Sequence, residues 1–217
     1  SATYESCEKV LTLAGKYPHV YAAIGVHPDE VGELNEDKIQ HMKELCCNKK
    51  VVAVGEIGLD YYWDNEPHEV QQKWFIRQLE LAGEVKKPVI IHSREAAADT
   101  MYIMKNYAQG LDGVIHCYSY SREMAEEYVK MGFYIGIGGV VTFKNAKKLK
   151  DVAAAIPIEK IVLETDCPYM APEPYRGKRN QSSYIRYVAE KIAELKEMSQ
   201  EEVIAVTEKN ARDLYGI

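Results

Sequence analysis

Six short apolar runs along the chain are separated by longer stretches whose apolar residues recur at helical spacing. Each run is apolar nearly throughout, which is typical of a strand covered on both faces of a parallel sheet. The predicted strands are Val20–Val26, Val51–Ile57, Pro88–His92, Gly113–His116, Phe133–Val141 and Lys160–Thr165. Because strands alternate with helices, the pattern predicts an α/β fold with right-handed crossovers.

The clearest predicted helix follows the second strand. Pro67 lies near its start, Phe75, Leu79 and Ala82 recur at helical spacing, and Lys86–Lys87 close it. This helix connects the second and third predicted strands.

Two more helices are predicted near the end of the chain. Asn180 and Ser182 are candidate caps for a helix that continues to about Lys196. The segment Ser199–Glu202 matches a capping box and predicts the start of the last helix.

The beginning of the chain does not fit a complete barrel. A barrel of strand–helix units starts with a strand and has eight of them, whereas this chain starts with the predicted helix Tyr4–Tyr17 and has six predicted strands. We therefore expect a TIM-type (β/α) barrel that is incomplete, with six of eight strands present and the first two missing. In the absence of a Gly/Ser linker or repeat, we expect residues 1–217 to form a single domain.

Charge and cysteine content narrow the choice of function. The 217 residues carry a formal net charge of −6, which argues against a broad basic surface for nucleic acid but leaves room for a local basic loop and a metal ion. The five cysteines are odd in number and show no CxxC spacing, which favours a reducing cytoplasm over a disulfide framework. No apolar run approaches the ~18 residues of a membrane span, and we expect no membrane partner.

Imidazoles and carboxylates are concentrated at the carboxyl ends of the predicted strands. His27, His92 and His116 lie there, together with Glu56 and Asp166. In a barrel, these strand ends form the face that carries the active site. Imidazole and carboxylate together form the ligand set of a catalytic divalent metal, so the placement predicts a metal site.

The remaining histidines have a simpler interpretation. His19, His41 and His68 lie in polar, loop-like or helical contexts and are expected to be solvated. Glu164 shares a strand face with Asp166, either as a partner of a ligand or as a member of a buried network.

Candidate substrate contacts lie close to these strand ends. Arg176, Lys178 and Arg179 surround a glycine just before a predicted helix, where they either hold phosphate oxygens or form an ordinary exposed basic loop. Arg94 is a second candidate phosphate contact or a salt-bridge residue at a helix start. Tyr118 either stacks on a base or ribose or packs in the protein.

Seven segments of the chain, in order, resemble the TatD family of barrel deoxyribonucleases. They are Gly25–Pro28, Gly55–Asp60, Pro88–Arg94, His116–Ser119, Glu164–Tyr169, Arg176–Asn180 and Asn210–Tyr215. The resemblance covers nearly the whole chain. It implies a barrel that hydrolyses DNA phosphodiester bonds with a divalent metal (Mg²⁺, Mn²⁺ or Zn²⁺), often as a 3′-to-5′ exonuclease.

The resemblance also implies roles for individual residues. Glu56 matches the metal-bridging carboxylate, and His92 and His116 match ligands of one ion. Asp166 matches the ligand that also positions or deprotonates the attacking water.

By the same resemblance, His27, Arg94 and the Arg176–Asn180 loop match substrate contacts.

One departure from the family pattern concerns the second ion. The family begins with a strand that carries a His-x-His pair, and no such pair occurs in these 217 residues. We therefore expect one metal site to be intact and the second to be compromised. Two alternatives follow: a weak or inactive barrel fragment that associates through open edges, or an amidohydrolase-like enzyme with another small substrate.

Overall fold

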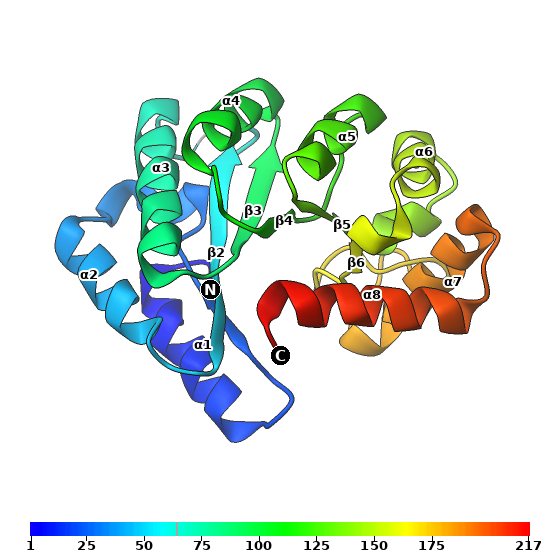
Figure 1. The fold of residues 1–217 in the computed structure, drawn as a ribbon, viewed down its shortest axis with the longest axis horizontal. Helices are drawn as coiled ribbons and strands as arrows, with labels where there is room; N and C mark the ends of the chain where they lie inside the picture. Colours follow the sequence, from blue (N-terminus) through cyan, green and yellow to red (C-terminus); the bar gives the residue numbers. More distant parts are fainter. Residues whose placement is uncertain (64) are drawn as a thin grey trace. The chain divides into compact units, whose positions relative to one another are not determined.

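Six strands alternate with helices in the computed structural model, which describes residues 1–63 and 65–217 (Figure 1). Ser1–Gly113 and Val114–Tyr215 form two compact units. The elements of the first unit are α1 (Tyr4–Lys16), β1 (Ala22–Ile24), the 3-10 helix η1 (Pro28–Glu33), α2 (Glu36–Leu45), β2 (Val51–Asp60), α3 (His68–Val85), β3 (Val89–Arg94) and α4 (Ala97–Tyr107). Among the described residues, no helix is both long and apolar enough to cross a membrane.

The second unit continues the same alternation. Its elements are β4 (Gly113–Ile115), α5 (Arg122–Lys130), β5 (Tyr134–Ile137), η2 (Gly139–Thr142), α6 (Lys147–Ala155), η3 (Ile158–Lys160), β6 (Ile161–Leu163), η4 (Ser182–Tyr184), α7 (Ile185–Lys196) and α8 (Gln200–Tyr215). All six predicted strands are therefore present, within ranges that differ at their ends.

In the first unit, β1, β2 and β3 pair in parallel in chain order. Ile57 lies opposite Ile91, and both are fully buried. Gly58 lies opposite His92 with φ 147°, and a Cβ atom at this position would come within 1.9 Å of the His92 carbonyl oxygen. Only glycine allows this approach, so Gly58 brings β2 and β3 together beside the residues discussed below.

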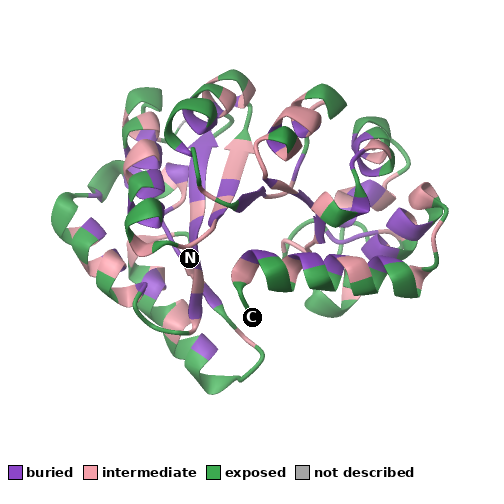
Figure 2. Cartoon of the chain, in the orientation of Figure 1, coloured by how far each residue is buried: buried purple, intermediate pink, exposed green. Residues whose placement is uncertain are grey.

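In the second unit, β4, β5 and β6 also pair in parallel, with Ile135 opposite both Ile115 and Ile161. Figure 2 shows buried residues along the strands and exposed residues on the outer faces of the helices in each unit. Asn210 of α8 is buried and donates to the carbonyl oxygens of Ile158 and Ile161, both at 2.8 Å. These bonds attach α8 to the start of β6.

The second half of the predicted fifth strand was wrong. The strand ends at Ile137, and Gly139–Thr142 form the 3-10 helix η2. At Gly139, a Cβ atom would lie 2.2 Å from the Met170 carbonyl oxygen, so the chain passes close to another backbone segment at this point.

The predicted cap at Asn180 was also wrong, whereas the last capping box is confirmed. The Asn180 amide donates to the carbonyl oxygens of Thr165 and Tyr169, both at 2.6 Å. Ser182 begins η4, and α7 starts at Ile185 without a side-chain cap. Ser199 and Glu202 form the expected reciprocal bonds at the start of α8, of 2.8–3.2 Å.

Candidate metal centre

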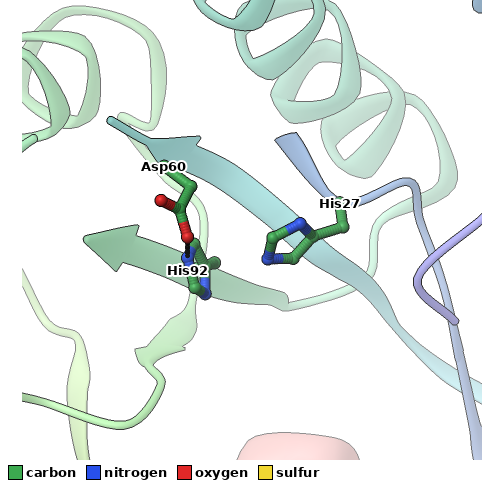
Figure 3. A group of neighbouring side chains, drawn as sticks. All are labelled: His27, Asp60 and His92. Atoms are coloured by element: carbon green, nitrogen blue, oxygen red, sulfur yellow. Dashed lines mark hydrogen bonds and ion pairs between the residues drawn. The ribbon is translucent and has the colours of Figure 1, made fainter. Parts of the chain in front are cut away.

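Three potential metal ligands of the first unit come from three consecutive strand ends. His27 follows β1, Asp60 ends β2 and His92 lies in β3. Figure 3 shows the Asp60 carboxylate bonded to His92 and the His27 ring next to this pair. One ligand atom from each residue lies within 4.8 Å of the others. Parallel pairing accounts for the cluster, because it brings the carboxyl ends of neighbouring strands to the same edge.

His92 is held between two carboxylates. Its Nδ1 lies 2.8 Å from Glu56 Oε1, and its Nε2 lies 2.9 Å from Asp60 Oδ2. Burial alone would lower the pKa of His92, but the hydrogen bonds to Asp60 and Glu56 outweigh it and raise the pKa to about 9. The two carboxylates therefore favour the protonated form of His92.

Asp60 is the ligand candidate that sequence reasoning missed. It is 1% exposed, and its Oδ1 accepts hydrogen bonds from the backbone N–H groups of Tyr62 and Trp63 at 2.9 and 3.3 Å. Burial favours the neutral acid, but the hydrogen bond from His92 and those from the backbone lower the pKa of Asp60. Asp60 is the last residue of β2. Its position at a strand end is the sequence signal that could have identified it.

A second missed carboxylate, Asp29, lies beside His27. Its backbone N–H donates to His27 Nδ1 at 3.3 Å, and its Oδ2 lies 3.6 Å from the same nitrogen. Burial, and then the charge of Asp60, raise the pKa of Asp29. Its Oδ1 is buried without a hydrogen-bond partner in the described part of the chain.

These observations fit a divalent cation in the first unit. A buried carboxylate oxygen without a partner is costly, and a cation nearby offsets that cost. The acidic and imidazole side chains are of the types that bind Mn²⁺ or Zn²⁺, and loss of the His92 proton frees a nitrogen for coordination.

The second unit contains its own imidazole–carboxylate cluster. His116 Nδ1 lies 2.7 Å from Glu164 Oε2, and its Nε2 lies 3.6 Å from Asp166 Oδ1. Ligand atoms of His116, Cys117 and Asp166 lie within 4.8 Å of one another. Of the two alternatives for Glu164, partner of a ligand or member of a buried network, the contact with His116 favours the first.

The backbone around this second cluster is unusual. Cys117 and Asp166 have φ of 46° and 52°, in the left-handed region that residues other than glycine rarely adopt. The Cys117 N–H donates to Glu164 Oε1 at 2.7 Å. Such conformations concentrate at functional sites, where the surrounding structure holds them.

The predicted substrate contacts differ in their surroundings. Arg176, Lys178 and Arg179 are exposed, and the Arg176 guanidinium lies 4.2 Å from the centre of the Phe143 ring. Arg94 is exposed at the end of β3, and its guanidinium lies over the Tyr62 ring.

Tyr118 is packed inside the second unit. It is 3% exposed, and its hydroxyl donates to the Ser121 carbonyl oxygen at 2.6 Å. In this conformation the packing alternative holds, because the ring face is not accessible to a base.

Three histidines were expected to be solvated. His19 and His68 are exposed, whereas His41 is half-buried and bonded to the Tyr4 hydroxyl at 2.8 Å.

Each unit thus brings together part of the predicted set. The first unit joins Glu56, His92 and His27, and the second joins His116 and Asp166. Their roles as metal ligands stay predictions.

Comparison with known proteins agrees with the predicted family. The profile of the family described as TatD related DNase matches residues 1–216. The chain is 47% identical to the uncharacterized metal-dependent hydrolase YabD of Bacillus subtilis (strain 168) over 210 residues, which cover 96% of this chain and 82% of that protein. It is 40% identical to the uncharacterized metal-dependent hydrolase YcfH of Escherichia coli (strain K12), over 94% of this chain and 77% of that protein.

Solved structures confirm the α/β fold of a TatD-type barrel. The crystal structure of YjjV, a TatD homolog from Escherichia coli K12, superposes with a TM-score of 0.93 at 32% identity, covering 100% of this chain and 85% of that chain. The hydrolase TatD family protein from Entamoeba histolytica gives a TM-score of 0.87 at 26% identity, covering 99% of this chain and 82% of that chain. The chain therefore belongs to the TatD family of metal-dependent hydrolases.

Proposed function

We propose that this protein hydrolyses phosphodiester bonds of DNA with a divalent cation, as a 3′-to-5′ exonuclease. The observation that carries the proposal is His92 between Glu56 and Asp60, a buried imidazole whose two neighbouring carboxylates suit a cation. The family description as TatD related DNase supports the choice of DNA.

The metal-binding groups we propose are Glu56, Asp60 and His92 in the first unit, and His116 and Asp166 in the second. When bound, a divalent cation lowers the pKa of water and offsets charge on a phosphate. Glu56 and Asp60 hold the His92 ring in one orientation through its two nitrogens.

In the second unit, Glu164 fixes the orientation of His116 through Nδ1. We assign proton acceptance from the attacking water to Asp166. Its side chain is 34% exposed, so its carboxylate is accessible to water. Within the described part of the chain, the N–H partner nearest to this carboxylate is that of His116, at 3.6 Å, which leaves it able to accept a proton.

Phosphate binding is assigned to the exposed basic loop. Arg176, Lys178 and Arg179 follow the Asp166 strand end and flank Gly177, whose φ is 82°. Guanidinium and ammonium groups bind phosphate oxygens strongly when desolvated. They also favour an anionic substrate over a neutral cyclic amide or lactone.

A substrate panel tests this proposal. The purified chain is incubated with manganese and one substrate at a time. The substrates are end-labelled single-stranded DNA, a cyclic amide, a lactone and a phosphotriester. We expect shortening of the DNA from its 3′ end and no turnover of the three small substrates. Turnover of a small substrate with intact DNA would instead favour an amidohydrolase-like enzyme.

A further inference from the structure

Two large aromatic side chains are exposed next to the Asp60–His92 pair. Tyr62 is 54% exposed and Trp63 is 57% exposed. Their ring centres are 4.9 Å apart at an interplanar angle of 86°. The Arg94 guanidinium lies 3.9 Å from the centre of the Tyr62 ring and 5.4 Å from that of Trp63. Two exposed aromatic rings in contact are a candidate place for a ligand to bind.

Asp60 fixes these aromatic residues to the candidate metal cluster. One of its oxygens accepts the N–H groups of Tyr62 and Trp63, and the other lies 2.9 Å from His92 Nε2. A single buried carboxylate therefore joins the backbone of the aromatic pair to the imidazole. The backbone that carries the two rings is thus fixed beside the cluster.

The preceding residue, Tyr61, differs from Tyr62 and Trp63 because its side chain is bound within the protein. Its ring is stacked on His68 at 3.5 Å, and its hydroxyl donates to Asp99 at 2.8 Å. Tyr61 is thus occupied by contacts within the protein. Tyr62 and Trp63 instead keep more than half of their surface in solvent.

We propose that Tyr62, Trp63 and Arg94 form a nucleobase subsite of the first unit. This inference rests on the proposed function and deepens it, because it assigns residues that recognise a base beside the phosphate to be cut. Aromatic rings stack on every base, and a guanidinium adds attraction to both the base and its phosphate. Arg94 also supplies positive charge beside the carboxylates of Asp29 and Asp60, which repel phosphate.

Two probes separate base stacking from phosphate contact. One is a fluorescein-labelled oligothymidylate, and the other is a tetrahydrofuran oligomer of equal length that has the same phosphates but no bases. Binding is followed by fluorescence anisotropy with calcium as the cation, for the wild type, Trp63→Ala and the control Tyr102→Ala. Tyr102 is 64% exposed on α4, so the control removes an equally exposed ring elsewhere in the unit.

We expect Trp63→Ala to weaken binding of oligothymidylate roughly 5- to 150-fold, the effect of losing one stacked base. Binding of the base-free oligomer should change by less than about twofold, as should both probes with Tyr102→Ala. Equal weakening of both probes by Trp63→Ala, or no difference between Trp63→Ala and Tyr102→Ala, would overturn the proposal.

Fluorescence provides a second readout. The chain has two tryptophans, and Trp74 is 6% exposed, so Trp74→Phe leaves Trp63 as the reporter. Oligothymidylate should quench this signal and the base-free oligomer should not; absence of quenching counts against the subsite. These binding results are independent of cleavage. A chain that cuts no DNA with manganese would contradict the proposed function even where base-dependent binding persists.

Discussion

Gln71 of α3 fixes the backbone of Asp60, a member of the first candidate metal cluster. Its side chain is fully buried, its Oε1 accepts the Asp60 N–H at 2.8 Å, and its Nε2 donates to the Asp60 carbonyl oxygen at 2.9 Å. The same Nε2 also donates to the Glu66 carbonyl oxygen at 3.0 Å. Gln71 therefore satisfies the backbone of Asp60 as a neighbouring strand would.

Replacing Gln71 with Met keeps the side-chain volume but removes these hydrogen bonds. Each bond contributes about 1 kcal/mol net, and each buried group left without a partner costs about 1–3 kcal/mol. For one N–H and two carbonyl groups, we expect the free energy of unfolding to fall by at least about 3 kcal/mol. Because Asp60 then loses its fixed position, we also expect metal affinity to fall about 10- to 100-fold.

Urea unfolding followed by far-UV circular dichroism measures the first effect, and calorimetric titration with manganese measures the second. The control is Gln40→Met, the same substitution at an exposed position of α2, which should change stability by less than about 0.5 kcal/mol. A Gln71→Met variant as stable as this control would refute the role given to Gln71.

When a chelator keeps the protein free of metal, His92 contributes to the free energy of unfolding. This contribution is fully present below the unfolded pKa of about 6.5 and is lost as the pH rises through the folded pKa of about 9. Urea unfolding across this range should show a decrease of up to about 3 kcal/mol that His92→Gln abolishes. Asn210→Ala should lower the free energy of unfolding by about 2 kcal/mol in a thermal melt, because the carbonyl groups of Ile158 and Ile161 lose their donor. In a metal titration of DNA cleavage, manganese should support more activity than magnesium, because imidazole ligands favour it; the reverse order would count against the ligand assignment.

The sequence was most informative where periodicity and chemistry coincided. Six apolar runs predicted six strands, because a strand buried on both faces leaves a nearly continuous apolar signature. Strand ends then located His27, His92 and His116, since parallel pairing places such ends at one edge. The capping box at Ser199 is a local pattern and needed no tertiary information.

Asp60 and Asn180 depend on contacts that are distant in sequence. Asp60 faces His92, 32 residues further along the chain, only after β2 and β3 have paired. Asp29 differs, because it lies two residues after His27 and its contact with that ring is local. Asn180 resembles a helix cap, yet its amide is taken by two carbonyl groups that lie 11 and 15 residues earlier.

Metal-dependent DNA hydrolysis is tested by cleavage of end-labelled single-stranded DNA with manganese by the wild type, Asp166→Asn and the control Asp151→Asn. Asp151 is an exposed carboxylate of α6, so its variant carries the same change in charge. We expect cleavage by the wild type and Asp151→Asn, and a loss of at least about 100-fold in Asp166→Asn. Equal cleavage by all three proteins, or none by the wild type, would contradict this expectation.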